Sequence, residues 1–250
     1  MKKIGKQVII FCFFTLNSIS FYGQTYANQK TYYKWFDSIV GVENLGIYNG
    51  VEYYKQYRTI EGSNEFYISN QFVKGDIVYD GQPYYDIDII YNVYDDEIII
   101  KLSNQKAFNI IQLIKEKIES FSIDNKRFVR VYNDKNEDFI NIKEGFYELL
   151  FQDNYLTLYK KYIKRRSERL DKDFAYYIFK DNKEYFLKHN QKYYSVNSKS
   201  NFSKIFPEHK KNINTFYKNN KVLRKSNYDM FLNKLSSYIE TLITTNKASN

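Results

Sequence analysis

Apolar and polar residues alternate over much of the chain between Tyr32 and Val196, in short runs that Asp, Asn and Gly separate. In the clearest run, residues 83–93, one alternate set is apolar and the other is mostly polar: Tyr85, Ile87, Ile89, Tyr91 and Val93 against Tyr84, Asp86, Asp88, Ile90 and Asn92. Consecutive side chains of a strand point to opposite faces, so the first set is expected to pack inward and the second to meet water. Over the whole chain, the pattern predicts an α+β protein with an antiparallel, β-rich body.

Tight-turn dipeptides divide these runs into hairpins. Asp80-Gly81 and Asp95-Asp96 predict reversals that join strands Asp76–Asp80, Pro83–Val93 and Glu97–Leu102 into a meander. Further strands are predicted at Phe108–Ile114, Ile118–Ile123, Arg127–Tyr132, Phe139–Ile142, Gly145–Phe151, Tyr155–Ile163, Phe174–Phe179, Glu184–Lys188 and Lys192–Val196, with weaker patterns at Gly46–Tyr48, Glu52–Tyr54 and Glu65–Ile68. The pattern leaves open whether the sheet closes into a barrel or stays open.

The period changes to three and four residues after Val196, which predicts helices. Ser200 is a candidate cap for a helix Asn201–Phe206, and Pro207 would end it and open the next helix, Glu208–Lys218. After a break at Asn219-Asn220, a longer helix is expected from Ser226 or Asn227, with this apolar stripe: Met230, Phe231, Lys234, Leu235, Tyr238, Ile239 and Leu242. Only Lys234 interrupts the stripe. We therefore expect a β-rich domain over residues 24–198 and C-terminal helices, 199–250, packed on it.

The N-terminus has the three-part order of a secretory signal peptide. Lys2, Lys3 and Lys6 precede the apolar run "VIIFCFFTL", and small residues follow it. The run is shorter than the roughly 20 residues that span a bilayer. We predict that residues 1–23 form the signal peptide, with cleavage after Ser20 or Gly23; an uncleaved anchor is the alternative. The protein would then be exported to the periplasm or the outer surface, without a later transmembrane segment.

Cleavage would remove Cys12, the only cysteine of the chain. The mature protein would then have no disulfide, no thiol nucleophile and no thiolate metal ligand. The formal charge of +9 is spread over the chain and is a weak argument for anionic partners. Tyrosine is abundant and recurs in doublets, at Tyr32-Tyr33, Tyr53-Tyr54, Tyr84-Tyr85, Tyr176-Tyr177 and Tyr193-Tyr194. In a strand, each doublet would give one ring to the core and one to the surface.

The stretch from Lys74 to Lys101 is dense in aspartate and tyrosine, and its acids are the first candidate site. Asp86 and Asp88 would lie about 7 Å apart on one face of a strand. Two carboxylates at such a separation can catalyse glycoside hydrolysis. A general acid also needs a raised pKa, and the flanking apolar residues are more typical of an exposed sheet face.

Metal and nucleophile signatures are incomplete. Asp134, Asn136 and Asp138 match the first ligands of a calcium loop, but Phe139 and Gly145 stand where an EF-hand needs glycine and glutamate. A hairpin loop is favoured there, and a looser calcium site stays open. His189 and His209 are the only histidines, too few for a site built from imidazole and thiolate. Neither a G-x-S-x-G elbow nor a glycine-rich phosphate loop occurs, so we assign no catalytic, metal-binding or cofactor-binding residue.

A basic run occupies residues 160–172, with Lys160, Lys161, Lys164, Arg165, Arg166, Arg169 and Lys172. Such a run could dock an anionic polymer through phosphate contacts. It is also typical of a solvated strand end and a long polar loop, in which Glu168 and Asp171 offset part of the charge. No pattern of stacking aromatics accompanies the run, and exported proteins seldom meet nucleic acid, so a nucleic-acid partner is not expected.

The order of elements resembles that of a group of uncharacterised exported proteins of Bacteroidota, of flavobacterial type. The resemblance rests on "FVKGDIVYDGQPYYDIDIIYNVYDDEIII", "GFYELLFQDNYLTLYKKY" and "QKYYSVNSKSNFSKIFPEHKKNINTFYKNNKV", together with the final helix. It covers most of the mature chain and depends on patterns instead of a catalytic signature. It implies an exported Gram-negative protein of unknown activity and supplies no functional residues.

These observations favour a non-catalytic exported protein that binds or scaffolds another component of the cell envelope, either a protein or a polysaccharide. Exposed rings of the tyrosine doublets are candidate contacts. The alternatives are a carboxylate-based hydrolase of envelope polymers and an anion-binding module centred on residues 160–172. An exposed aromatic or apolar patch would favour the binding protein, and two acids in one cleft would favour the hydrolase. The sequence leaves the oligomeric state and the ligand open.

Overall fold

The structure is a computed structural model, and it describes residues 24–41, 44–60, 62–103, 108–132, 142–171 and 174–248. The predicted signal peptide, the loop with Asp134, Asn136 and Asp138, Lys172, and all but Ile142 of the predicted strand Phe139–Ile142 lie outside the described residues.

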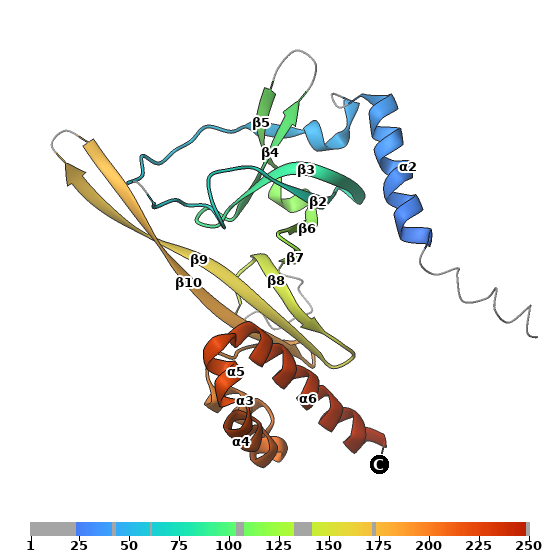
Figure 1. Ribbon diagram of the computed structural model, residues 1–250, viewed down its shortest axis with the longest axis vertical. Helices are drawn as coiled ribbons and strands as arrows, with labels where there is room; N and C mark the ends of the chain where they lie inside the picture. The colour runs from blue at the N-terminus through green and yellow to red at the C-terminus, as the bar shows by residue number, and fades with distance from the viewer. Residues whose placement is uncertain are drawn as a thin grey trace, which may run out of the picture.

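Within these residues, eleven antiparallel strands form one sheet in the order β1-β5-β4-β3-β2-β6-β7-β8-β9-β10-β11 (Figure 1). The strands are β1 Gly50–Glu52, β2 Val73–Tyr79, β3 Gln82–Asn92, β4 Glu97–Ser103, β5 Phe108–Leu113, β6 Ile118–Ile123, β7 Lys126–Val131, β8 Gly145–Gln152, β9 Leu156–Asp171, β10 Phe174–His189 and β11 Lys192–Ser195. The sheet is open, with β1 at one edge and β11 at the other. The predicted α+β class with an antiparallel, β-rich body is confirmed.

The hairpin turns explain why most predicted strands lie where the alternation placed them. At Asp80-Gly81, Asp124-Asn125 and Asn190-Gln191, both central residues have positive φ. Two such residues make the turn type whose twist matches that of the flanking strands. Glycine, asparagine and aspartate adopt this backbone conformation most readily, so the turn signals were readable locally.

Helix α2, Gln24–Val40, was not predicted and replaces the β structure expected from Tyr32 onward. The doublet Tyr32-Tyr33 therefore lies in a helix, not in a strand. Tyrosine, tryptophan, phenylalanine and isoleucine are common in strands, and their abundance concealed a helical spacing of three and four residues.

Other upstream predictions were also wrong. Gly46–Tyr48 is a turn of 3-10 helix, η2, and the expected strand Glu65–Ile68 has only one isolated bridge, between Phe66 and Asn92. Of the predicted Glu52–Tyr54, only Glu52 belongs to a strand. The separate strands predicted over 174–179 and 184–188 are one strand, β10, because the polar residues between them pair with β9 across the whole hairpin.

A β-bulge reverses the alternation predicted for β3. Gly75 pairs with Ile87 and Ile77 pairs with Tyr84, so two steps along β2 match three along β3. Tyr85 and Asp86 of β3 therefore both stand against Asp76 of β2, and Asp86 has a φ of 56°. A bulge puts the alternation before it out of phase with the alternation after it, and here the residues before it are the ones reversed. Tyr84 is therefore buried, instead of the expected Tyr85, while Ile89 and Tyr91 face the core as predicted.

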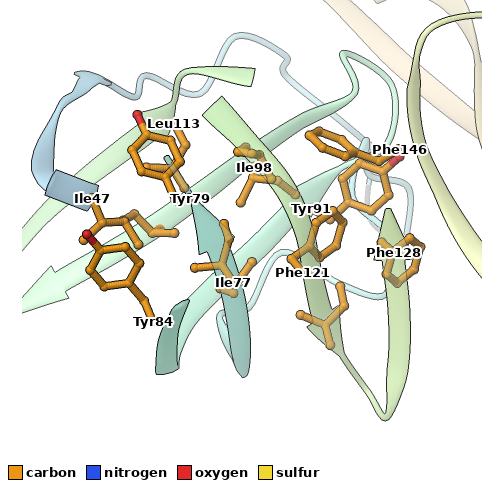
Figure 2. Packing of buried hydrophobic residues seen from close by; sticks show 14 of the residues in the cluster. Ile47, Ile77, Tyr79, Tyr84, Tyr91, Ile98, Leu113, Phe121, Phe128 and Phe146 are labelled. Carbon is orange, nitrogen blue, oxygen red and sulfur yellow. The ribbon is translucent and has the colours of Figure 1, made fainter. Parts of the chain in front are cut away.

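The N-terminal part of the sheet curls around the larger core (Figure 2). Its fully buried side chains come from η2 and from strands β2 to β8, among them Ile47, Ile77, Tyr79, Tyr91, Ile98, Phe121, Phe128 and Phe146. Phe121 and Phe128 stack with their ring centroids 4.8 Å apart. Because β8 shares this core with β2 to β5, the turn between β3 and β4 comes close to β8 and β9.

The C-terminal helices cover the other end of the sheet (Figure 1). They are α3 Lys199–Ile205, the 3-10 turn η4 Pro207–His209, α4 Lys210–Asn219, α5 Lys221–Ser226 and α6 Tyr228–Ala248. Phe231, Leu235 and Ile239 of the predicted stripe are buried with Leu158 and Leu187 of the sheet. The caps are Ser198 and Asn227, whose side chains accept from Asn201 N–H and Met230 N–H. Ser200 is therefore not the cap of α3, and α5 was not predicted.

Candidate functional site

A long β hairpin projects from the sheet at the end far from the C-terminal helices α3 to α6 (Figure 1). Its strands β9 and β10 have 16 residues each. β8 pairs with β9 only as far as Lys160, and β11 pairs with β10 only from Phe186. We call the part beyond these pairings, residues 161–171 and 174–185, the arm. An element that extends past its neighbours presents more of its side chains to other molecules.

The described part of the basic run, from Lys160 to Arg169, lies in strand β9, so the strand extends through the region where a strand end followed by a long polar loop was expected. Its cations divide into internal and exposed ones. Lys161 and Lys164 have side chains exposed by only 14% and 8%, and each makes an ion pair. Arg165, Arg166 and Arg169 are exposed on the arm. The run therefore offers fewer cations to a partner than its sequence suggests.

The far end of the arm combines apolar and cationic groups. Leu170 and Phe174 are exposed by 79% and 52%. The guanidinium of Arg58 lies 4.3 Å from the centre of the Phe174 ring, and that of Arg166 lies 4.9 Å from the ring of Tyr177. Cations at these distances from a ring are attracted to its face. Arg58 also accepts a hydrogen bond from Tyr177 N–H at its carbonyl oxygen, at 2.9 Å, which attaches the segment before β2 to the arm.

The base of the arm borders a cleft of about 540 Å³. A cluster of ion-paired side chains, centred on Asp96, forms part of its wall. The cleft is lined by Val93, Tyr94, Asp96, Lys115, Lys143, Glu144, Tyr147, Lys161, Tyr162, Ile163, Lys164, Arg165, Glu184 and Phe186. Asp96 accepts hydrogen bonds from Lys115 Nζ and Lys161 Nζ, both at 2.7 Å. It also accepts from the Tyr91 hydroxyl at 2.6 Å and from Phe146 N–H at 3.3 Å.

Opposing effects set the protonation of this cluster. Burial alone would raise the pKa of Asp96, but the nearby Lys161 and Lys115 outweigh it and hold the pKa below its ordinary value. Burial lowers the pKa of Lys161, and Asp96 offsets this only in part. A carboxylate with a lowered pKa and four donors is a poor general acid, since it holds no proton at neutral pH. The cluster therefore resembles a structural ion network more than a catalytic centre.

Gly145 leaves the space that this cluster occupies, because it has no side chain. Its φ is +152°, and a Cβ there would overlap Asp96 Oδ2 and lie 2.7 Å from Lys161 Nζ. Glycine is thus required both by the backbone conformation and by the close approach of two charged side chains.

A second ionic network joins the helices to the arm. Lys160 is buried and lies 2.6 Å from Asp229 Oδ2 on α6 and 3.5 Å from Glu148 Oε2 on β8. The Tyr185 hydroxyl donates to Asp229, and the Tyr162 hydroxyl donates to Glu148, both at 2.6 Å. Every charge here has a partner, as burial requires.

Glu65 differs from these paired charges. It is fully buried, and among the described residues neither of its carboxyl oxygens has a hydrogen-bond partner. Burial raises the pKa of Glu65, because the charged form loses its hydration. Its backbone carbonyl accepts from Val93 N–H at 3.0 Å, which attaches the segment before β2 to the end of β3.

Asp86 and Asp88 make separate ion pairs. Asp86 lies 3.0 Å from Lys30 Nζ and 2.7 Å from Lys34 Nζ on α2, whereas Asp88 lies 3.0 Å from Lys74 Nζ. Hydrogen bonds from Lys34 and Lys30 lower the pKa of Asp86. This is the opposite of the shift that a general acid needs, so the geometry does not support an acid–base pair.

The two histidines lie apart in different interactions. His189 Nδ1 is 3.1 Å from the Tyr155 carbonyl oxygen, and the buried His209 lies 3.7 Å from Glu208. In the part of the chain that the structure describes, no three His, Cys, Asp or Glu side chains are grouped so that they could hold a metal ion.

The exposed face of α2 carries the surface that sequence reasoning missed. Tyr32, Trp35, Phe36 and Ile39 are exposed by 70%, 61%, 53% and 63%, and we call these four residues the α2 stripe. Their spacing of three, four and seven places them on one face of the helix. The signal was present in the sequence, but the same residues were interpreted as strand formers.

Comparisons leave the family open. No family model matches the chain, and no curated protein or solved structure does either. The resemblance to exported Bacteroidota proteins therefore stays a prediction. Across the described residues, no helix combines the length and hydrophobicity needed to cross a bilayer.

Proposed function

We propose that this chain is a non-catalytic exported protein of the cell envelope, which uses the arm to dock onto another envelope component. The observation that carries the proposal is the projecting hairpin with the exposed side chains of Leu170 and Phe174 at its far end. Two exposed apolar side chains beside exposed arginines, at the end of an element that extends beyond its sheet, favour a contact with another molecule there.

The chemistry of the arm favours an acidic protein as the partner. Arg165, Arg166 and Arg169 are exposed along β9, next to the apolar end. Arginine around an apolar centre is typical of protein interfaces, and its charge favours a partner that carries carboxylates. A polysaccharide is the second possibility. It has less support, because Leu170 offers no flat ring and Arg58 lies over the ring of Phe174.

The hydrolase has weaker support than the binding protein. Its two candidate acids each pair with lysine, and the enclosed acid of the cleft, Asp96, is occupied by four donors. The proposed function therefore rests on surfaces and not on a reacting group.

Site-specific photo-cross-linking in the cells that produce the protein tests the proposal. A photoreactive residue at position 170 is expected to yield a defined adduct with the partner. Export is tested separately: N-terminal sequencing of the mature chain should give Phe21 or Gln24 as the first residue. Position 222 is the matched control, because Val222 is an equally exposed apolar residue, at 82%, on α5.

Replacing Arg165 and Arg169 by glutamate should abolish the adduct at position 170 without unfolding the protein, since these side chains are exposed. Arg166 is left unchanged, because its guanidinium lies over the ring of Tyr177. Equal adducts at positions 170 and 222, or no adduct at position 170, would overturn the proposal.

A further inference from the structure

Helix α2 turns its apolar face to solvent and its lysines to the sheet, the reverse of an ordinary surface helix. Such a helix normally turns its apolar face to the core and its charges to solvent. Here Lys30 and Lys34 point toward the sheet, where they pair with Asp76 and Asp86, while the α2 stripe faces outward. The helix contacts the sheet beside β3 at the edge of the molecule, where Tyr33 packs against Tyr85 (Figure 1).

The α2 stripe has an uncharged surrounding on its own helix. The charged residues of α2 are Lys30, Lys34 and Asp37, and helical geometry places all three on the side opposite the stripe. Polar residues without charge, such as Gln29 and Ser38, flank the stripe instead. The chain carries a formal charge of +9, but two copies that meet at this face would not bring like charges of α2 together.

We propose that the α2 stripe is an interface between two copies of this chain, related by a two-fold axis. An isologous contact brings the same patch of both copies together, so it requires a patch that does not repel itself. A membrane surface is the less favoured occupant, because helices that lie on membranes carry lysine and arginine on the face beside the apolar one. In α2 the lysines are committed to carboxylates of the sheet.

The area of the stripe is consistent with a reversible dimer. Aromatic side chains bury about 150–250 Å² each, and with Ile39 taken at the lower value the exposed fractions of the four residues correspond to roughly 450 Å² per copy. Two copies would bury about 900 Å² on these side chains, near the lower limit of about 1,000 Å² for a specific interface. Neighbouring polar residues would add the remainder. We therefore expect association with a dissociation constant of about 1–100 μM. The inference is independent of the arm and of any partner that binds there.

Trp35 provides a direct probe, because it is the only tryptophan of the chain. In a monomer its indole is largely exposed, and in the dimer it is buried between the helices. Over a dilution series of the purified protein, sedimentation should show a shift from dimer to monomer. The emission of Trp35 should move to longer wavelength over the same range of concentrations.

The variant F36S/I39S keeps the probe and removes about half of the stripe. It should be monomeric at every concentration, with a red-shifted emission of Trp35 and an unchanged circular dichroism spectrum. The control V222S removes a side chain that is 82% exposed on α5 and should dimerise like the parent.

Three outcomes would overturn the inference. The first is a parent protein that stays monomeric up to about 1 mM, well above the dissociation constant expected from the area. The second is dimerisation of F36S/I39S equal to that of the parent. The third is a blue shift of Trp35 that appears only with anionic phosphatidylglycerol vesicles, which would assign the stripe to a membrane surface.

Discussion

Asp96 offers the sharpest test of the physical account, because replacement by asparagine keeps its shape and removes its charge. Lys161 and Lys115, both 2.7 Å away, would lose their common counter-ion while their side chains stay 14% and 28% exposed. Removing one partner of a buried pair costs about 3–5 kcal/mol, mainly through the charge left behind. Because neither lysine is fully enclosed, and Lys161 can release its proton, we expect a loss near the lower value, about 3 kcal/mol.

This loss can be followed by thermal unfolding monitored by circular dichroism. For a chain of this size, about 3 kcal/mol corresponds to a decrease in Tm of about 6–12 °C. The pH dependence supplies a second criterion. The pKa of Asp96 is lowered, so its stabilising contribution is complete above the ordinary carboxyl pKa of about 4 and is lost as the pH falls through the lowered value. The parent and D96N should therefore differ most at neutral pH and converge in acid.

D80N is the matched control. Asp80 also lies in a hairpin turn with positive φ, at 53° against 59° for Asp96. It pairs with Lys117 at 2.9 Å, but the two side chains are exposed by 62% and 37%. An exposed pair contributes about 0–1 kcal/mol, so D80N should change little. If D96N lost no more stability than D80N, or if its loss were the same at pH 7 and in acid, the reasoning about burial would be refuted.

Two further predictions concern Glu65 and Gly145. The raised pKa of Glu65 means that ionising its buried carboxyl destabilises the folded state. This destabilisation is absent below the ordinary carboxyl pKa of about 4 and grows as the pH rises toward the raised value. E65Q should therefore be more stable than the parent at pH 7 and equal to it at pH 4, by urea midpoints; an equal difference at both pH values would contradict this. G145A should lose about 1–3 kcal/mol, because of its positive φ and the overlap with Asp96. The double variant G145A/D96A, in which alanine removes the overlapping atoms, should lose less than the sum of the G145A and D96A losses, and strict additivity would show that the contact is absent.

Most strands could be predicted from the sequence because the information is local. β6, Ile118–Ile123, has the predicted boundaries, since alternation and the turn Asp124-Asn125 define it within a few residues. The bulge at Asp86 was not readable in this way. It depends on how β3 pairs with β2, and a single extra residue there reversed the predicted orientation of Tyr84 and Tyr85.

The α2 stripe shows a different limit. Its spacing of three and four residues is present in the sequence, but its residue types favour strands and the helix does not bury them. Pattern reasoning assumes that an apolar stripe faces the core, and here the cations face the sheet instead. The exposure of Trp35 depends on the ion pairs of Lys30 and Lys34 with Asp76 and Asp86, which only the tertiary structure shows.

The candidate sites depend most strongly on tertiary structure. Local periodicity determined the antiparallel β-rich body, its turns and the C-terminal helices, because period and turn chemistry act over a few residues. The acidic stretch and the basic run were two separate features in the sequence, yet Asp96 of one and Lys161 of the other, 65 residues apart, share a hydrogen bond. Only the curl of the sheet brings them together, since the pairing of distant charges leaves no trace in local alternation. The same long-range pairing decided which cations of the basic run are exposed on the arm and which face α2 presents to solvent.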